Sequence, residues 1–140
     1  MQLEPYLFFN GNCEEAITYY AKVFGGEITQ LHRFETMPGE HPVPDDYKQK
    51  IMHATLETPA FKLMASDGRA GAAQKGGNIS LSLGTSDRAE GERVFNALAE
   101  GGTVDMPLAD QFWGARFGQL TDRFGIDWMI NIALAPVSAN

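Results

Sequence analysis

Histidines are the side chains of this sequence with the clearest capacity for proton transfer. The chain has three of them: His32 and His53 lie in stretches that alternate apolar and polar residues, and His41 lies in a proline-rich segment. His53 is the best candidate for acid–base chemistry, because an unperturbed imidazole changes charge near neutral pH. In the alternation it shares one face with Ile51, Thr55 and Glu57. A histidine that only forms a hydrogen bond across strands fits the same pattern.

Two further charged side chains are candidates for contact with a substrate. Asp127 follows a turn at Gly125 and would orient a ligand or act as a base, unless it is simply solvated there. Arg116, in a predicted strand, would bind an anionic substrate, and the alternative is a surface charge at a sheet edge.

The motifs of nucleophilic hydrolysis and of nucleotide binding are absent from the sequence. It has no phosphate-binding GxxxxGK[ST] loop and no GxSxG elbow, and its single cysteine, Cys13, lies on the apolar face of a predicted helix. The glycine-rich run DGRAGAAQKGG lacks the dinucleotide fingerprint. These two classes of chemistry are therefore not supported.

An internal repeat supplies the elements that would position the candidate side chains. Each half of the chain has the pattern of a strand, a helix that ends at a glycine pair, and a second strand. In the first half these are residues 3–9, 13–24, Gly25-Gly26 and 27–33, and in the second half residues 78–83, 87–100, Gly101-Gly102 and 103–108. Two more strands follow in each half, over residues 51–57 and 61–66 and over residues 112–120 and 126–133. The sequence therefore predicts an α+β fold made of two βαβββ modules.

The helix ends carry local signals. Asn12 is the predicted cap of the first helix, and Gly25 would end it in the left-handed conformation. Asp87 is the predicted cap of the second helix and Gly101 its stop, whereas Gly91 weakens its interior.

Composition and charge restrict the class of protein. The chain has 140 residues, of which 44% are hydrophobic and 21% charged, as expected for one globular domain. Its net charge of −7 would repel a nucleic-acid backbone. One cysteine permits neither an internal disulfide nor a cysteine-based zinc site, which is typical of a reducing compartment. With no signal peptide and no apolar segment long enough for a membrane span, we expect a soluble cytoplasmic protein.

Two segments lie outside the repeat. Residues 34–50 contain three prolines and four carboxylates and are predicted to form a long irregular loop, either a lid or a solvated insertion. Residues 68–77 are small and glycine-rich, as a flexible linker would be. The single domain of residues 1–140 would then consist of module one, about 1–67, and module two, about 78–135.

Several runs of the sequence resemble a known family. PYLFFNGNCEEAITYYAKVFGGEI, HATLE, LMASDG, ISLSLG and DRFGIDWMIN are similar to the PhnB-like branch of the glyoxalase/bleomycin-resistance/dioxygenase (vicinal oxygen chelate) superfamily, and the likeness covers nearly the whole chain. The resemblance implies mixed sheets that curl around a cavity, helices packed on the outside, and a homodimer. It says little about the reaction, because fold and chemistry are separable.

The alternation within the strands divides their residues between a core face and a cavity face. The predicted core contains Ile79, Leu81, Leu83, Ile126, Trp128, Ile130, Ile132, Phe61, Leu63 and Ala65. The predicted ligand-binding residues are Thr55, Lys62, Met64, Ser66, Asn78, Ser80, Ser82, Arg116, Met129 and Asn131, beside His53 and Asp127 as catalytic candidates. A sheet face that is merely exposed to solvent would show the same alternation.

Metal-dependent relatives hold a divalent cation with histidine and glutamate side chains on the first and last strands of each module. Alignment by the helix and turn positions puts Pro5, Met64, Asn78 and Met129 at these four places. Because none is an imidazole or an anionic oxygen donor, no metal or other cofactor is predicted. A different site made of His32, His53 and Glu57 is the alternative that a shifted alignment would allow.

Most aromatic residues are assigned to packing, in the core or where modules join. This set contains Phe8, Phe9, Tyr19, Tyr20, Phe24, Phe95 and Trp128. The pair Phe112-Trp113, beside Gly114, would either close over a cavity or pack in the core.

Three functions follow from these observations. The first is a metal-free protein that binds a small polar or aromatic molecule in a cavity, as bleomycin-resistance relatives do by sequestration. The second is an isomerase or lyase that uses His53 or Asp127 for proton transfer, and the third is a metal-dependent lyase or dioxygenase with unrecognised ligands. A methyltransferase assignment, which some members of the branch carry, lacks the glycine-rich nucleotide loop of a doubly wound sheet. A link to phosphonate metabolism would rest on resemblance alone.

Overall fold

The computed structural model describes residues 1–36, 43–68 and 77–135. It separates into two compact units, Met1–Gln74 and Lys75–Asn140, and each is described here by itself. Most of the predicted linker, residues 69–76, lies outside the described part, as does His41. No helix within the described residues is long and apolar enough to span a bilayer.

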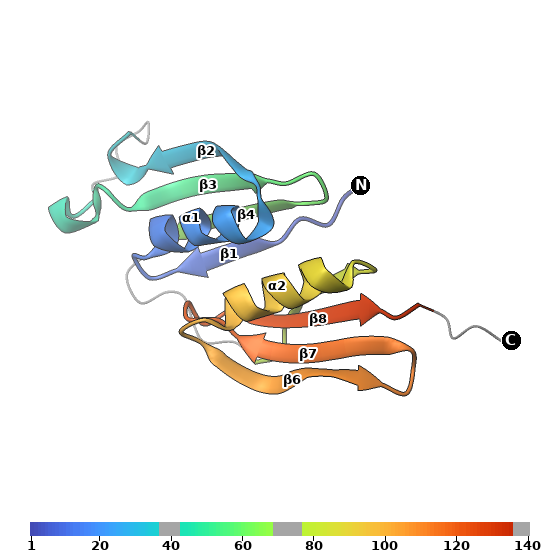
Figure 1. The fold of residues 1–140 in the computed structure, drawn as a ribbon. Helices are drawn as coiled ribbons and strands as arrows, with labels where there is room; N and C mark the ends of the chain where they lie inside the picture. The colour runs from blue at the N-terminus through green and yellow to red at the C-terminus, as the bar shows by residue number, and fades with distance from the viewer. Residues whose placement is uncertain (37–42, 69–76, 136–140) are drawn as a thin grey trace, which may run out of the picture. The chain divides into compact units, whose positions relative to one another are not determined.

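The first unit is a four-stranded mixed sheet with one α-helix on one of its faces (Figure 1). Its elements are β1 Tyr6–Phe9, α1 Cys13–Phe24, β2 Glu27–Arg33, β3 Ile51–Glu57 and β4 Lys62–Asp67. The strand order is β1-β4-β3-β2, with β1 parallel to β4 and the other neighbours antiparallel.

The second unit repeats this arrangement. Its elements are β5 Leu81–Thr85, α2 Arg88–Ala99, β6 Thr103–Gln111, β7 Ala115–Thr121 and β8 Asp127–Ala133. The strand order is β5-β8-β7-β6, again with a parallel pair, β5 and β8, at one side. The predicted pair of βαβββ modules is thus confirmed.

The first strand of each unit begins later than predicted. β1 starts at Tyr6 instead of residue 3, and β5 starts at Leu81 instead of residue 78. The parallel pairing of each strand begins at that point, Tyr6 with Met64 and Leu81 with Trp128. Ile79 therefore lies before β5 and is 75% exposed, so its predicted place in the core is wrong.

The segment between β2 and β3 contains two short 3-10 helices, η1 Phe34–Thr36 and η2 Asp45–Tyr47, on either side of residues 37–42, which the structure does not describe. The hydroxyl of Tyr47 donates to the carbonyl oxygen of Gly68, and burial raises the pKa of Tyr47. The described part of this segment is therefore anchored to the end of β4.

Helical spacing predicts an apolar stripe on α1 made of Cys13, Ala16, Ile17, Tyr20 and Phe24. The first four are buried against the sheet together with Val23, whereas Phe24 is only half-buried. The buried side chains of α1 pack with buried residues of β3 and β4, among them Ala54, Leu56, Leu63 and Ala65. In the second unit Val94, Phe95 and Leu98 of α2 pack in the same way with Trp128, Ile130 and Ile132.

The cap of α1 is formed differently from the prediction. The Asn12 side chain makes no capping hydrogen bond. Instead, the buried carboxylate of Asp67, at the end of β4, accepts from the N–H groups of Gly11 and Cys13 at 2.8 and 2.9 Å. In α2 the prediction is confirmed, because Asp87 accepts from the N–H of Glu90 at 3.1 Å.

The repeated glycine pairs have two different roles. Gly25 and Gly101 have φ angles of 66° and 74°, in the left-handed region that ends a helix. A Cβ on Gly26 or Gly102 would lie 2.8 or 2.3 Å from the carbonyl oxygen at the end of β3 or β7. The second glycine of each pair is therefore required by a close backbone approach.

Candidate functional site

Six side chains of the first sheet point away from α1, and together we call them the open face. They are Tyr6 and Phe8 of β1, His53 and Thr55 of β3, and Met64 and Ser66 of β4. Their strands place Tyr6 beside Met64, Met64 beside Thr55, and Phe8 beside Ser66. On this face the small polar side chains are buried, since Thr55 and Ser66 are each 5% exposed. The aromatic rings of Tyr6 and Phe8 are accessible to solvent, at 37% and 58% exposure.

His53 is held at both of its ring nitrogens. Nδ1 lies 3.2 Å from the hydroxyl oxygen of Tyr6, and Nε2 lies 2.9 Å from the hydroxyl oxygen of Thr55. The rings of Tyr6 and His53 are tilted against each other with centroids 5.7 Å apart, and the Phe8 ring lies 5.0 Å from that of Tyr6. The result is a hydrogen-bonded row, Thr55–His53–Tyr6, that runs from a buried hydroxyl to an exposed one.

Ile51 does not share the face of His53, contrary to the prediction. His32 is paired with His53 and Arg33 with Ile51, so β3 contains one extra residue, Met52, at this point. Such a bulge reverses the alternation beyond it. Ile51 is accordingly fully buried in the core.

The other charged groups near this face lie on β2, β3 and β4. His32 is exposed and is paired directly with His53 across the strands. Lys62 forms an ion pair with Glu57 at 3.6 Å, at the far end of β3. Lys62 and Glu57 also line a cleft of about 480 Å³ with Pro5 and residues of the β3–β4 turn.

The residues at the usual metal positions do not fit a metal site of the family. Pro5 precedes β1 and Met64 lies on β4, while Asn78 precedes β5 and Met129 lies on β8. A proline, two thioethers and a neutral amide give no hard anionic or imidazole donor. Among the residues that the structure describes, no three histidine, cysteine, aspartate or glutamate side chains come together as a metal site, and this includes His32, His53 and Glu57.

The second unit brings together three of the predicted residues in a cleft. Asn78 and Ser80, just before β5, line a space of about 450 Å³ with Asp127 at the start of β8. Asp127 accepts from the hydroxyl of Thr121 at 2.7 Å, and the same hydroxyl lies 3.1 Å from Asp105. Ser82, Met129 and Asn131 lie farther along the same two strands, on the sheet face away from α2.

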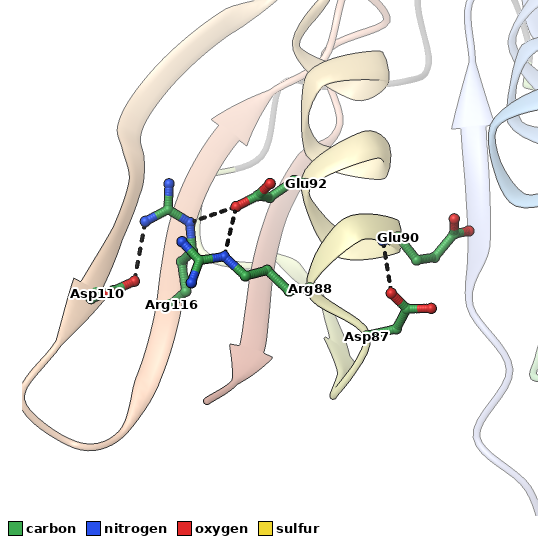
Figure 2. A network of polar contacts seen from close by, with 6 residues as sticks. All are labelled: Asp87, Arg88, Glu90, Glu92, Asp110 and Arg116. Atoms are coloured by element: carbon green, nitrogen blue, oxygen red, sulfur yellow. Dashed lines mark hydrogen bonds and ion pairs between the residues drawn. The ribbon is translucent and has the colours of Figure 1, made fainter. Parts of the chain in front are cut away.

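Arg116 lies on the other face, toward the helix. Its Nε is 3.1 Å from Glu92 of α2 and its Nη1 is 3.1 Å from Asp110 of β6. Glu92 is shared with Arg88, so that two guanidinium groups and two carboxylates form one network (Figure 2). The structure therefore commits Arg116 to ion pairs and does not bring it to the other predicted ligand residues.

Sequence reasoning missed Tyr6 and misplaced Phe8, which it assigned to packing. The signal was present in β1, because Tyr6 and Phe8 alternate with Leu7 and the buried Phe9. Four consecutive apolar or aromatic residues hid this alternation. Phe112 and Trp113 are likewise outside the core, at 97% and 51% exposure in the β6–β7 turn.

Cys13 is unsuited to nucleophilic chemistry. Its side chain is fully buried, and burial, together with the charge of Asp67, raises the pKa of the thiol to about 12. At neutral pH the thiolate, which is the reactive form, is therefore almost absent.

Comparison with known proteins was made by sequence and by structure. The model of the family described as 3-demethylubiquinone-9 3-methyltransferase matches residues 1–131. Protein YjdN of Escherichia coli K12 is 34% identical, over 94% of this chain and 95% of its own length. The crystal structure of protein PA1353 from Pseudomonas aeruginosa is 47% identical, covers 96% of this chain and 99% of its own, and superposes with a TM-score of 0.84.

More distant structures identify the fold. A PhnB protein from Bacillus cereus is 27% identical with a TM-score of 0.78, over 95% of this chain and all of its own. An enzyme of the glyoxalase/bleomycin-resistance/dioxygenase family from Burkholderia phytofirmans covers 94% of this chain and 97% of its own, at 14% identity and a TM-score of 0.66. At that identity the likeness shows the architecture alone, which is the glyoxalase/bleomycin-resistance fold that the sequence predicted.

Proposed function

This chain belongs to the 3-demethylubiquinone-9 3-methyltransferase family, with its PhnB-like members, and we propose that it binds a small polar or aromatic molecule on the open face of its first sheet. Its ligand has a flat apolar part, which packs on Tyr6 and Phe8, and a polar group, which meets the hydrogen-bonded row behind them. No metal takes part.

One observation carries this proposal, an exposed pair of aromatic rings, Tyr6 and Phe8, beside a hydrogen-bonded row whose inner end is buried. Phe8 is 58% exposed although it belongs to a regular strand, and its neighbour Ser66 is buried. Exposed aromatic side chains with converging hydroxyl and imidazole groups are the usual composition of a small-molecule site. A surface that served only solubility would present charged side chains there.

The name of the family describes a methyl transfer, and the proposal does not rest on that name. Within the described residues, each unit has a mixed, four-stranded sheet and one α-helix. Neither has the doubly wound parallel sheet whose glycine-rich turn holds a nucleotide-type cofactor. Because fold and chemistry are separable, the side chains of the open face carry the proposed function.

Proton transfer is the second candidate, and the fixed orientation of His53 favours it. A base or acid that is oriented by a second group can transfer a proton efficiently in an isomerase or lyase. Asp127 is the corresponding candidate in the second unit, where Thr121 orients its carboxylate. Turnover by the wild type that is lost in His53→Ala would favour this candidate over binding alone.

We also propose that the chain forms a homodimer, as the resemblance implies. β6 supports this, because it is a nine-residue strand at the edge of its sheet, and an exposed edge strand is a pairing hazard unless it is covered. It is exposed along most of its length and carries Val104 and Met106 at 43% and 41% exposure. Light scattering behind size exclusion should give twice the chain mass, and a strict monomer would remove the proposal.

The binding function is tested with a set of small aromatic acids, phenols and amides, by saturation-transfer NMR. We expect several to bind wild type, and Phe8→Ala to weaken them by about tenfold, as the loss of an aromatic contact should. Phe112→Ala removes a ring that is more exposed but lies outside the open face, and it should leave binding unchanged. Equal effects of the two substitutions would contradict the proposal.

A further inference from the structure

We infer that Tyr6 is the residue that donates a hydrogen bond to an oxygen atom of the ligand, and that His53 is a positioning residue behind it. The ligand is then a small aromatic compound with an oxygen acceptor, a carboxylate in preference to a neutral amide. This inference rests on the proposed function, since it assigns roles within the open face.

His53 has no ring nitrogen left for a ligand. Nδ1 is within 3.2 Å of Tyr6 and Nε2 within 2.9 Å of Thr55. Thr55 is 5% exposed, so the row is closed at its inner end. A ligand that bonded the imidazole directly would have to break one of these contacts, whereas the exposed Tyr6 hydroxyl is reached without breaking any.

Which group donates in each hydrogen bond of the row follows from the number of hydrogens that each group carries. A hydroxyl donates one hydrogen bond and accepts others. When Nδ1 carries the proton, Thr55 donates to Nε2, Nδ1 donates to Tyr6, and the phenolic hydrogen is left for the ligand. When both nitrogens are protonated, Nδ1 still donates to Tyr6, and Tyr6 still points its hydrogen outward. Only when Nδ1 is unprotonated does the Tyr6 hydroxyl donate its hydrogen to the imidazole instead of to the ligand.

A ligand oxygen therefore selects the forms of His53 that carry a proton on Nδ1. A carboxylate selects them more strongly than an amide does, because the imidazolium places a positive charge directly behind the donor. A carboxylate should therefore bind more tightly at acidic than at alkaline pH, because a positively charged imidazole behind Tyr6 favours the anion.

The charged groups around His53 are compatible with this preference. Beside Tyr6 itself, His32 is paired directly with His53 across the strands, and it is also basic. Glu57 lies four residues along β3, about 13 Å away at the usual strand rise, and is neutralised in part by Lys62 at 3.6 Å. Glu27 is paired with Glu57 at that same distant end.

Benzoate and benzamide are suitable probes, because they share one shape and differ in charge. Each is titrated into ¹⁵N-labelled protein at pH about 6 and about 8, on either side of the usual range of imidazole. We expect benzoate to bind more tightly at the lower pH and benzamide to show little change. Tyr6→Phe, which keeps the ring and removes the donor, should weaken benzoate about tenfold or more at both pH values. Tyr19→Phe removes a hydroxyl from α1, outside the open face, and serves as the control.

The ¹⁵N spectrum of His53 in wild type gives a second test that needs no variant. Binding of benzoate should increase the fraction of His53 that is protonated at Nδ1, whereas a histidine with no role in binding would show no change. The inference is overturned if both probes shift the open-face amides while Tyr6→Phe binds benzoate as wild type does, or if Nδ1 stays bare in the complex. If neither probe shifts those amides in wild type, the proposed function itself fails.

Discussion

The carboxylate of Asp67, at the last position of β4, accepts a hydrogen bond from the backbone N–H of Cys13, at the first position of α1, at 2.9 Å. The same side chain accepts from Gly11 and, through its other oxygen, from Ile51 at 2.9 Å. It is 2% exposed. One buried carboxylate thus connects the start of α1, the start of β3 and the end of β4. β3 and β4 are two of the three strands that carry the open face.

Replacement of Asp67 by alanine should therefore be severely destabilising. Three backbone N–H groups would lose their acceptor, and each buried donor left unpaired costs about 1 to 3 kcal/mol. We expect the free energy of unfolding to fall by about 3 kcal/mol or more in urea denaturation. Asp87→Ala, which removes the exposed cap of α2, should cost only about 1 kcal/mol. Similar losses in the two variants would contradict the role of Asp67.

Replacement of Gly91 by alanine should destabilise the protein, although alanine is the better helix former by about 1 kcal/mol. A Cβ at this position would lie 2.5 Å from Cγ1 of Ile132, which is fully buried. Overpacking of this kind costs about 1 to 3 kcal/mol, so we expect a lower melting temperature.

Two further variants separate packing from helix propensity at this contact. Ala89→Gly, at an exposed position of the same helix, should cost about 1 kcal/mol from propensity alone. In an Ile132→Ala background, Gly91→Ala should become neutral or stabilising. An increase in stability on Gly91→Ala alone would show that Ile132 moves aside freely.

The raised pKa of Cys13 should appear as a loss of stability at alkaline pH. The thiol titrates near 9.0 when exposed and at about 12 in the folded protein. The folded state therefore holds this proton more tightly, so its contribution to stability is complete below pH 9.0 and is lost as the pH rises toward about 12. Wild type should lose up to about 1.4 kcal/mol per pH unit more than Cys13→Ala in this window. Parallel curves for the two proteins would contradict the assignment.

Added metal should not stabilise the protein. Thermal melts in Zn²⁺, Mn²⁺, Ni²⁺ and Fe²⁺, with metal analysis of protein purified without a His tag, provide the measurement. A specific site at about 100 times its Kd would add roughly 2.7 kcal/mol, or several degrees. One metal per chain with such a shift would make an oxygen-chelating lyase or dioxygenase the leading function.

The sequence predicted those parts of the fold that local signals determine. Gly25 and Gly101 ended their helices as expected, and the predicted stripe from Cys13 to Tyr20 lies on the buried face of α1. Prediction from the sequence failed where the decisive contact joins residues that are far apart in the chain. The cap of α1 comes from Asp67, more than fifty residues away, and no local pattern at Asn12 reports it.

The candidate site was predicted only in part, for a related reason. Alternation placed Thr55, Met64 and Ser66 together with His53, and the structure agrees. The bulge at Met52, which moves Ile51 into the core, depends on pairing with β2 and leaves no mark in the sequence. Arg116 follows the alternation to the opposite face, where Glu92 and Asp110 hold it.

Backbone amide shift mapping with the strongest ligand of the aromatic set tests the central claim most directly. The account predicts that the shifted amides cluster on β1, β3 and β4, around residues 6–8, 53–55 and 64–66, and that Phe8→Ala needs about ten times as much ligand to give the same shifts. Shifts that fall instead around residues 117–119 and 129–131 of the second sheet, or a wild-type affinity in Phe8→Ala, would contradict it.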